Sequence, residues 1–152
     1  MAQNSFIPSK GKWLIKEHTF AASVAATEKG DMIQVTASGI TVALGTSTAT
    51  AIIGIAAEDS ALTTATRTIR VFEPTSKMCE FIGQVTDGAI AAGFTDSNRP
   101  CDLEDHEGID TDTDSEHSFT IVRGLVATAD GSSTAGKGVF RIAQTMDNLS
   151  SF

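Results

Sequence analysis

The chain has 152 residues and a formal net charge of −8 at pH 7, from 11 Lys and Arg against 19 Asp and Glu. This balance argues against a nucleic-acid partner, because binding to a phosphate backbone needs clustered basic side chains that displace counterions. The length is enough for one domain with its own hydrophobic core. The chain is rich in Thr, Ala, Ile and Val, with 13 Gly, 3 Pro and no Tyr. We therefore expect a mainly β, single-domain protein with little helix.

The N-terminal residues lack the charged-then-apolar pattern of a signal peptide, and no apolar run approaches the length that spans a bilayer. We expect a soluble protein with no membrane partner, made and used in the cytoplasm. Two cysteines, Cys79 and Cys101, are too few for a disulfide framework. We expect free thiols, with Cys79 as a small core residue.

Residues 1–12 form a polar N-terminal arm in which Phe6 and Ile7 are the only large apolar pair. Such an arm is either a disordered terminus or a segment that becomes ordered against a partner. In the second case Phe6, Ile7 and Trp13 are the expected anchors. Trp13, the only Trp, is equally consistent with a place in the core. The β-rich domain is expected to follow, over residues 13–152.

The first strand is predicted over residues 13–20, before an alanine-rich stretch that is compatible with one or two helical turns. A hairpin is predicted over residues 28–44. In its first strand Ile33 and Val35 alternate with polar residues, and its return strand alternates in the same way after a Gly-containing turn.

The stretch 49–73 is expected to be central to the fold. Residues 52–57 are apolar on both alternating faces, which is typical of a short strand covered on two sides, with small residues where another backbone comes close. Residues 66–72 interleave Thr and Arg with Ile69 and Val71, which predicts a strand with one solvent-exposed face. The polar residues between them predict a turn.

The remaining elements follow from similar patterns. Strands are predicted over 78–85, with Cys79, Phe81, Gly83 and Val85 on one face, and also over 117–126 and 137–143. Residues 89–94 are ambiguous between a strand and a helical turn. Loops are predicted over 96–100 and 128–136, and an apolar-spaced tail over 145–152.

The acidic tract, residues 102–116, has the highest charge density of the chain and is expected to be a solvent-facing loop insertion over 102–118. Asp110, Asp112 and Asp114 occupy the first, third and fifth positions of a calcium loop. The sixth position is Ser115 where Gly is needed, and the twelfth is Ile121 where Glu is needed. A solvated acidic loop and a calcium-dependent binding module over 110–116 both remain open.

The residue spacing supports no transition-metal site, no catalytic site and no phosphate-binding loop. His106, His117, Cys79 and Cys101 match no usual metal-ligand pattern. There is no Gly-x-Ser-x-Gly motif and no phosphate-cradling glycine loop. We expect no catalytic residue, no metal site and no cofactor, and hence a protein that is not an enzyme.

Three segments carry a combined pattern: EKGDMIQV at 28–35, IGIAAED at 53–59 and IRVF at 69–72. Together they resemble the head decoration, or cement, proteins of tailed bacteriophages. In that family a hairpin led by Gly-Asp is followed by an apolar Gly-Ile-Ala-Ala strand and a further strand of the β-rich body. The resemblance covers roughly residues 28–85, is compatible with the closing strand, and does not extend over the acidic tract.

The resemblance implies a small β-barrel or tulip-like β domain with an extended N-terminal arm, which binds the outside of an expanded capsid and stabilises it by bridging capsid subunits. The implied partner is the major capsid protein, with the chain as a homotrimer on the outer capsid surface of a virion assembled in the host cytoplasm. Deletion of residues 1–12 is expected to weaken binding and leave the fold intact. The alternatives are a minor head or tail structural component and the calcium-dependent module.

Overall fold

The structure is a computed structural model that describes residues 6–20, 26–36, 39, 41–49, 51–61, 67–127 and 136–143. These residues form eleven strands: β1 (Ile7–Lys10), β2 (Trp13–Phe20), β3 (Met32–Val35), β4 (Val42–Leu44), β5 (Ile52–Ala56), β6 (Arg67–Pro74), β7 (Glu80–Asp87), β8 (Pro100–Asp105), β9 (Gly108–Asp110), β10 (Phe119–Val126) and β11 (Gly136–Ile142). The described residues include no helix, which confirms the mainly β prediction. Accordingly, none of the described segments is a helix that could cross a membrane.

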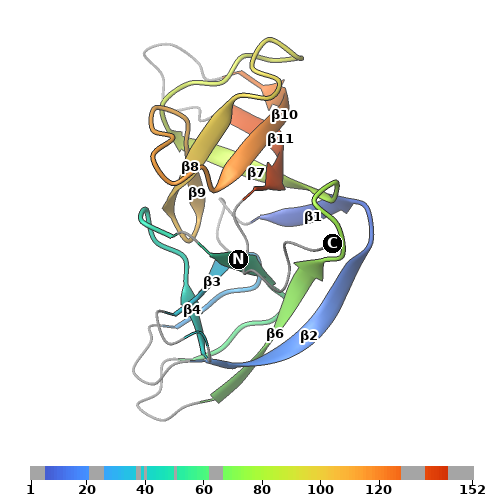
Figure 1. The fold of residues 1–152 in the computed structure, drawn as a ribbon, viewed down its shortest axis with the longest axis vertical. Helices are drawn as coiled ribbons and strands as arrows, with labels where there is room; N and C mark the ends of the chain where they lie inside the picture. Colours follow the sequence, from blue (N-terminus) through green and yellow to red (C-terminus); the bar gives the residue numbers. More distant parts are fainter. Residues whose placement is uncertain are drawn as a thin grey trace.

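The strands form two units. Strands β2, β4, β3, β5 and β6 make a closed barrel, and the other six form a sheet in the order β1-β7-β11-β10-β8-β9. Strand β9 also pairs with β7, in parallel, which brings the far end of this sheet back toward its beginning. In Figure 1 the sheet is stacked above the barrel, β1 lies where the two units meet, and β2 runs from there down the side of the barrel.

Most predicted strands are confirmed. Strand β2 has the expected bounds, and β3 and β4 pair as the expected antiparallel hairpin. Strands β6, β7, β10 and β11 lie on their predicted segments. Residues 89–94 form neither strand nor helix, apart from one bridge between Gly93 and Gly124. The predictions for 21–25, 128–135 and 144–152 concern residues outside those that the structure describes.

Strand β5 is buried over its whole length, as its two apolar faces predicted. Ile53 and Ala56 belong to the cluster that fills the barrel, whereas Ile52 and Ile55 belong to the larger cluster beneath the six-stranded sheet. Gly54 lies where β5 meets β6, and a Cβ on it would collide with the carbonyl oxygen of Phe72. The strand therefore serves as wall for two cores at once, and its glycine permits the close approach of β6.

The core of the six-stranded sheet is built around Phe81. Its ring makes edge contacts with Phe6 and Phe119, with centroids 5.6 and 5.4 Å apart, and stacks on Phe140 at 5.8 Å. All four side chains are at most 1% exposed. Such aromatic pairs add stabilisation beyond their buried area. The cluster joins residues from the beginning, middle and end of the chain.

The prediction of a solvent-facing loop over residues 102–118 is wrong for its first half. Residues 100–110 form the β8–β9 hairpin, in which Leu103 and Ile109 are buried in the core. Asp102 is 1% exposed and accepts hydrogen bonds from the backbone N–H groups of Glu116 and Ser118. Because backbone donors satisfy this carboxylate, an acidic segment can occupy a buried position.

Candidate partner-binding surface

The segment predicted as an N-terminal arm is built into the domain from Phe6 onward. Strand β1 pairs antiparallel with β7, with Ile7 opposite Ile82. Phe6 donates its backbone N–H to the Gly30 carbonyl at 2.8 Å and is 1% exposed. Deletion of residues 1–12 would remove this core side chain and an entire strand. The expectation that such a deletion leaves the fold intact is therefore wrong.

A hollow of about 450 Å³ lies where β1 passes the barrel. Its walls are mostly apolar and come from β1, β2, β5, β6 and the turn before β3. The lining residues are Phe6, Ile7, Pro8, Trp13, Lys29, Gly30, Ala56 and Phe72. An apolar concavity that several strands hold in shape is suited to receiving side chains of a partner.

A tight turn between β1 and β2 shapes one side of this hollow. Gly11 has φ +86°, and a Cβ there would lie 2.7 Å from the Cys79 sulfur, so the turn requires glycine. The Trp13 indole Nε1–H donates to the carbonyl of Lys10 across the turn at 3.0 Å. This bond fixes the indole at the start of β2, partly buried against the main core.

The apolar character continues from the hollow along β2. Ile15 shares a face with Trp13 because strand side chains alternate, and it lies directly opposite Phe72 of β6. Ile7 and Ile15 are 55% and 54% exposed, which is high for such large apolar side chains. We call the patch of Ile7, Trp13, Ile15 and Phe72 the β1–β2 surface.

Lysines accompany the β1–β2 surface, although the chain as a whole is acidic. Lys10 and Lys12 lie in and beside the turn between β1 and β2, and Lys29 lines the hollow. All three residues are exposed. They make up three of the 11 basic residues of a chain with net charge −8. A partner surface with apolar side chains and a negative rim would be complementary to this patch.

Of the three predicted anchors, the structure brings Ile7 and Trp13 together on the β1–β2 surface and places Phe6 beneath them, in contact with Phe81. Sequence reasoning missed Ile15 and Phe72. A signal for Ile15 was present, since Leu14 and Ile15 are consecutive apolar residues in a strand and must therefore point to opposite faces. Burial of both side chains would require packing against both faces of the strand.

Within the acidic tract, the carboxylate of Asp110 makes hydrogen bonds inside the fold. Asp110 accepts hydrogen bonds from the backbone N–H of Asp112 and from the hydroxyl of Thr113, each at 2.8 Å. Its close acidic neighbours are Asp87 and Glu104, whose carboxylate oxygens lie within 4.8 Å of it and of each other. Burial, followed by the charges of neighbouring carboxylates, raises the pKa of Glu104. Of the three aspartates at the first, third and fifth positions of the calcium-loop pattern, only Asp110 belongs to this group.

Comparisons with known proteins add no assignment: no protein-family model, no curated protein and no solved structure matches the chain.

Proposed function

We propose that this chain is a structural virion protein, a head decoration protein that binds the outer surface of an expanded phage capsid and stabilises the shell by bridging neighbouring capsid subunits. The observation that carries the proposal is the β1–β2 surface, which combines exposed Ile7 and Ile15 with a preformed apolar hollow. Exposed apolar patches that are rimmed by polar residues are typical of protein–protein contact sites.

The arrangement of the family-like segments supports the same proposal. The three segments that resemble decoration proteins contain β3, most of β5 and part of β6, and these strands are consecutive neighbours in the barrel. The pattern thus belongs to one continuous wall, and Phe72 of its last segment lies in the β1–β2 surface. The part of the chain that resembles the family is also the part that supports the candidate contact.

The chemistry of β1 indicates how the contact is made. This strand is at an edge of the six-stranded sheet, where a partner strand could in principle add to it. Pro8 lacks a backbone N–H, and Lys10 adds charge at the same edge. Both features disfavour strand addition, so the side chains of the β1–β2 surface make the contact with the capsid protein.

Bridging follows from multivalency. The family-like assembly is a homotrimer on the capsid, in which each protomer presents one β1–β2 surface to the major capsid protein. Linked weak contacts bind together far more tightly than any one alone, provided that the geometry lets them engage simultaneously. A trimer that engages neighbouring subunits would therefore hold them together against internal pressure.

The direct test mixes the purified full chain with expanded, undecorated phage heads and measures bound protein by sedimentation and gel densitometry. The expected result is saturable binding at a copy number that matches the symmetry sites of the shell. A copy number far below that of the major capsid protein would instead indicate a minor head or tail component. Absence of saturable binding would contradict the proposal.

The contact itself is tested with the double variant Ile7→Ser and Ile15→Ser. Both side chains are more than half exposed, so their loss should weaken binding to heads by at least about tenfold and leave the fold intact. The matched control is Val126→Ser on β10, a similarly exposed apolar residue outside the β1–β2 surface. Equal affinity of the double variant and the control would exclude this surface as the contact.

A further inference from the structure

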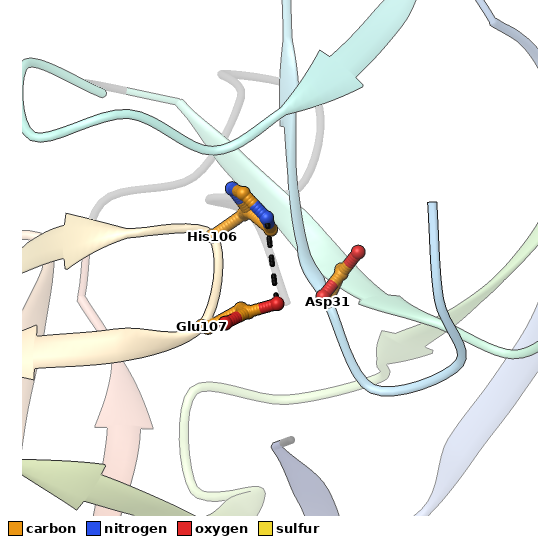
Figure 2. A group of neighbouring side chains, drawn as sticks. All are labelled: Asp31, His106 and Glu107. Carbon is orange, nitrogen blue, oxygen red and sulfur yellow. Dashed lines mark ion pairs between the residues drawn. The ribbon is translucent and has the colours of Figure 1, made fainter. Parts of the chain in front are cut away.

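A group of three ionisable side chains joins the barrel to the six-stranded sheet. Asp31 lies immediately before β3, and His106 and Glu107 form the turn between β8 and β9. Each residue offers one ligand atom, and these atoms all lie within 4.8 Å of one another. Figure 2 shows the three side chains gathered where the β8–β9 turn meets the segment that leads into β3. The two halves of the group come from different units of the fold.

Backbone hydrogen bonds hold these two segments together. The Met32 N–H donates to the His106 carbonyl at 2.8 Å, which directly ties β3 to the β8–β9 turn. On the barrel side, Ala56 donates its N–H to the Asp31 carbonyl, also at 2.8 Å. In the turn, the Glu107 N–H donates to an Asp105 carboxylate oxygen at 2.8 Å. The group is therefore held in place by the fold.

Asp31 has an unusual environment for a carboxylate. It is 1% exposed, and its Oδ2 accepts a hydrogen bond from the Glu28 N–H at 2.8 Å. Its Oδ1 is buried, and no hydrogen-bond donor reaches it from the described residues. Burial raises the pKa of Asp31 to about 6, although the Glu28 N–H and His106 oppose this shift. A buried carboxylate oxygen without a partner is costly, and a bound ion, a bound water or a functional role can account for one.

The available donors indicate the kind of ion. Two carboxylates and one imidazole form a mixed oxygen and nitrogen set, which suits divalent transition metals better than Ca²⁺, whose ligands are oxygens. The imidazole Nε2 of His106 is 3.7 Å from a Glu107 carboxylate oxygen (Figure 2). Donor atoms that share a tetrahedral Zn²⁺ at its usual bond lengths lie about 3.4 Å apart. The Asp31 ligand atom lies within 4.8 Å of the other two, so His106 and Glu107, whose side chains are about one-third exposed, are the residues that close the remaining distance to this buried carboxylate.

We propose that Asp31, His106 and Glu107 bind one divalent transition-metal ion of the Zn²⁺ class, which cross-links the barrel to the six-stranded sheet. The ion supplies the missing partner for the buried Asp31 carboxylate. Its role is structural, because it fixes the turn at residues 28–31, of which Lys29 and Gly30 line the hollow of the β1–β2 surface. The metal site itself stands independently of the proposed capsid function.

The test titrates Zn²⁺ alone into the metal-stripped full chain at pH 7 by isothermal calorimetry. The expected result is saturable binding of one ion per chain. His106→Gln should weaken that binding by at least about tenfold, since even outer partners of metal ligands are worth 10–100-fold. Asp31→Asn, which keeps the shape of the side chain and can still accept the Glu28 N–H bond, should weaken binding similarly.

The matched control is Glu104→Gln, which alters the second acidic group, that of Asp87, Glu104 and Asp110. Its Zn²⁺ affinity should equal that of the wild type. The proposal is overturned by absence of saturable binding, by wild-type affinity in His106→Gln, or by loss of binding in Glu104→Gln. Far-UV circular dichroism verifies that each variant folds, and the partly exposed His106 keeps the test decisive even if Asp31→Asn does not fold. No capsid is present, so failure here is distinct from failure of the proposed function.

Discussion

The barrel and the six-stranded sheet have cores of different kinds. The barrel is filled mainly by aliphatic side chains between residues 20 and 71, with Phe20 as its aromatic member. The sheet is centred on four phenylalanines that range from Phe6 to Phe140. The barrel core is thus local in sequence, whereas the sheet core needs both ends of the described chain to be in place.

The barrel also supplies the layer on which the six-stranded sheet packs. Met32, Ile52 and Ile55 belong to barrel strands, yet they pack in the same cluster as Phe81. The sheet therefore buries its apolar face against the outer wall of the barrel, and neither unit has a complete core alone. We expect the two units to unfold together in one cooperative transition.

The largest expected effect comes from Phe81→Ala, which removes the centre of the aromatic cluster. It should lower the free energy of unfolding by about 3–5 kcal/mol, the usual cost of deleting a buried Phe side chain. Urea titrations followed by near-UV and far-UV circular dichroism should both shift to lower urea and still coincide. Separate transitions for the two signals would show that barrel and sheet are independent, against the shared core.

A smaller effect on the barrel side is expected from Gly54→Ala. The added methyl group meets the Phe72 carbonyl and lies 2.9 Å from a Val71 side-chain carbon, and the backbone of a closed barrel has little room to yield. Overpacking of this kind costs about 1–3 kcal/mol. Thr68→Ala, on the exposed face of β6, is the control and should change stability by less than about 0.5 kcal/mol. Equal urea midpoints for the two variants would argue against a rigid β5–β6 contact.

A pH-dependent effect is expected from Cys101 in the sheet. Burial raises the pKa of its thiol, opposed mainly by the charge of Arg99. Above roughly pH 9 the unfolded chain loses this proton and the folded chain keeps it, so the free energy of unfolding falls as pH rises, by up to about 1.4 kcal/mol per pH unit. Urea titrations between pH 8 and 10 should show this extra slope for the wild type and not for Cys101→Ala. Identical slopes would contradict the burial of the thiol.

The smallest effect on stability is expected from Ile15→Ser on β2. This side chain is 54% exposed, so the free energy of unfolding should change by less than about 0.5 kcal/mol. Ile55→Val, at a fully buried position of the shared core, should cost about 0.5–1.5 kcal/mol and so exceed it. Thermal melts that reverse this order would show that Ile15 is part of the core rather than of a contact surface.

The sequence predicts the barrel well because its strands alternate or are uniformly apolar over short distances. The two-sided burial of β5 follows directly from the run Ile52-Ile53-Gly54-Ile55. The β8–β9 hairpin does not follow from the sequence, because a high charge density predicts exposure. Asp102 is buried because backbone donors at Glu116 and Ser118 reach it, and the sequence alone does not show that the chain folds back to supply them.

The candidate sites were likewise only partly predictable from the sequence. Ile7 and Trp13 were predictable as apolar residues in a polar segment, but the inward position of Phe6 depends on Phe81, 75 positions later in the chain. Asp31 and His106 are equally far apart in sequence. Only the contact between β3 and the β8–β9 turn brings them together, so no motif search could have found the group.

The position of Trp13 makes its intrinsic fluorescence a reporter of binding at the hollow. As the only Trp, it accounts for the indole fluorescence of the chain, and its ring lies on the wall of the hollow. A partner that fills the hollow displaces water from the indole and should shift its emission to shorter wavelength. Occupancy of the β1–β2 surface can therefore be followed in real time without any added label, in any mixture whose other components are poor in tryptophan.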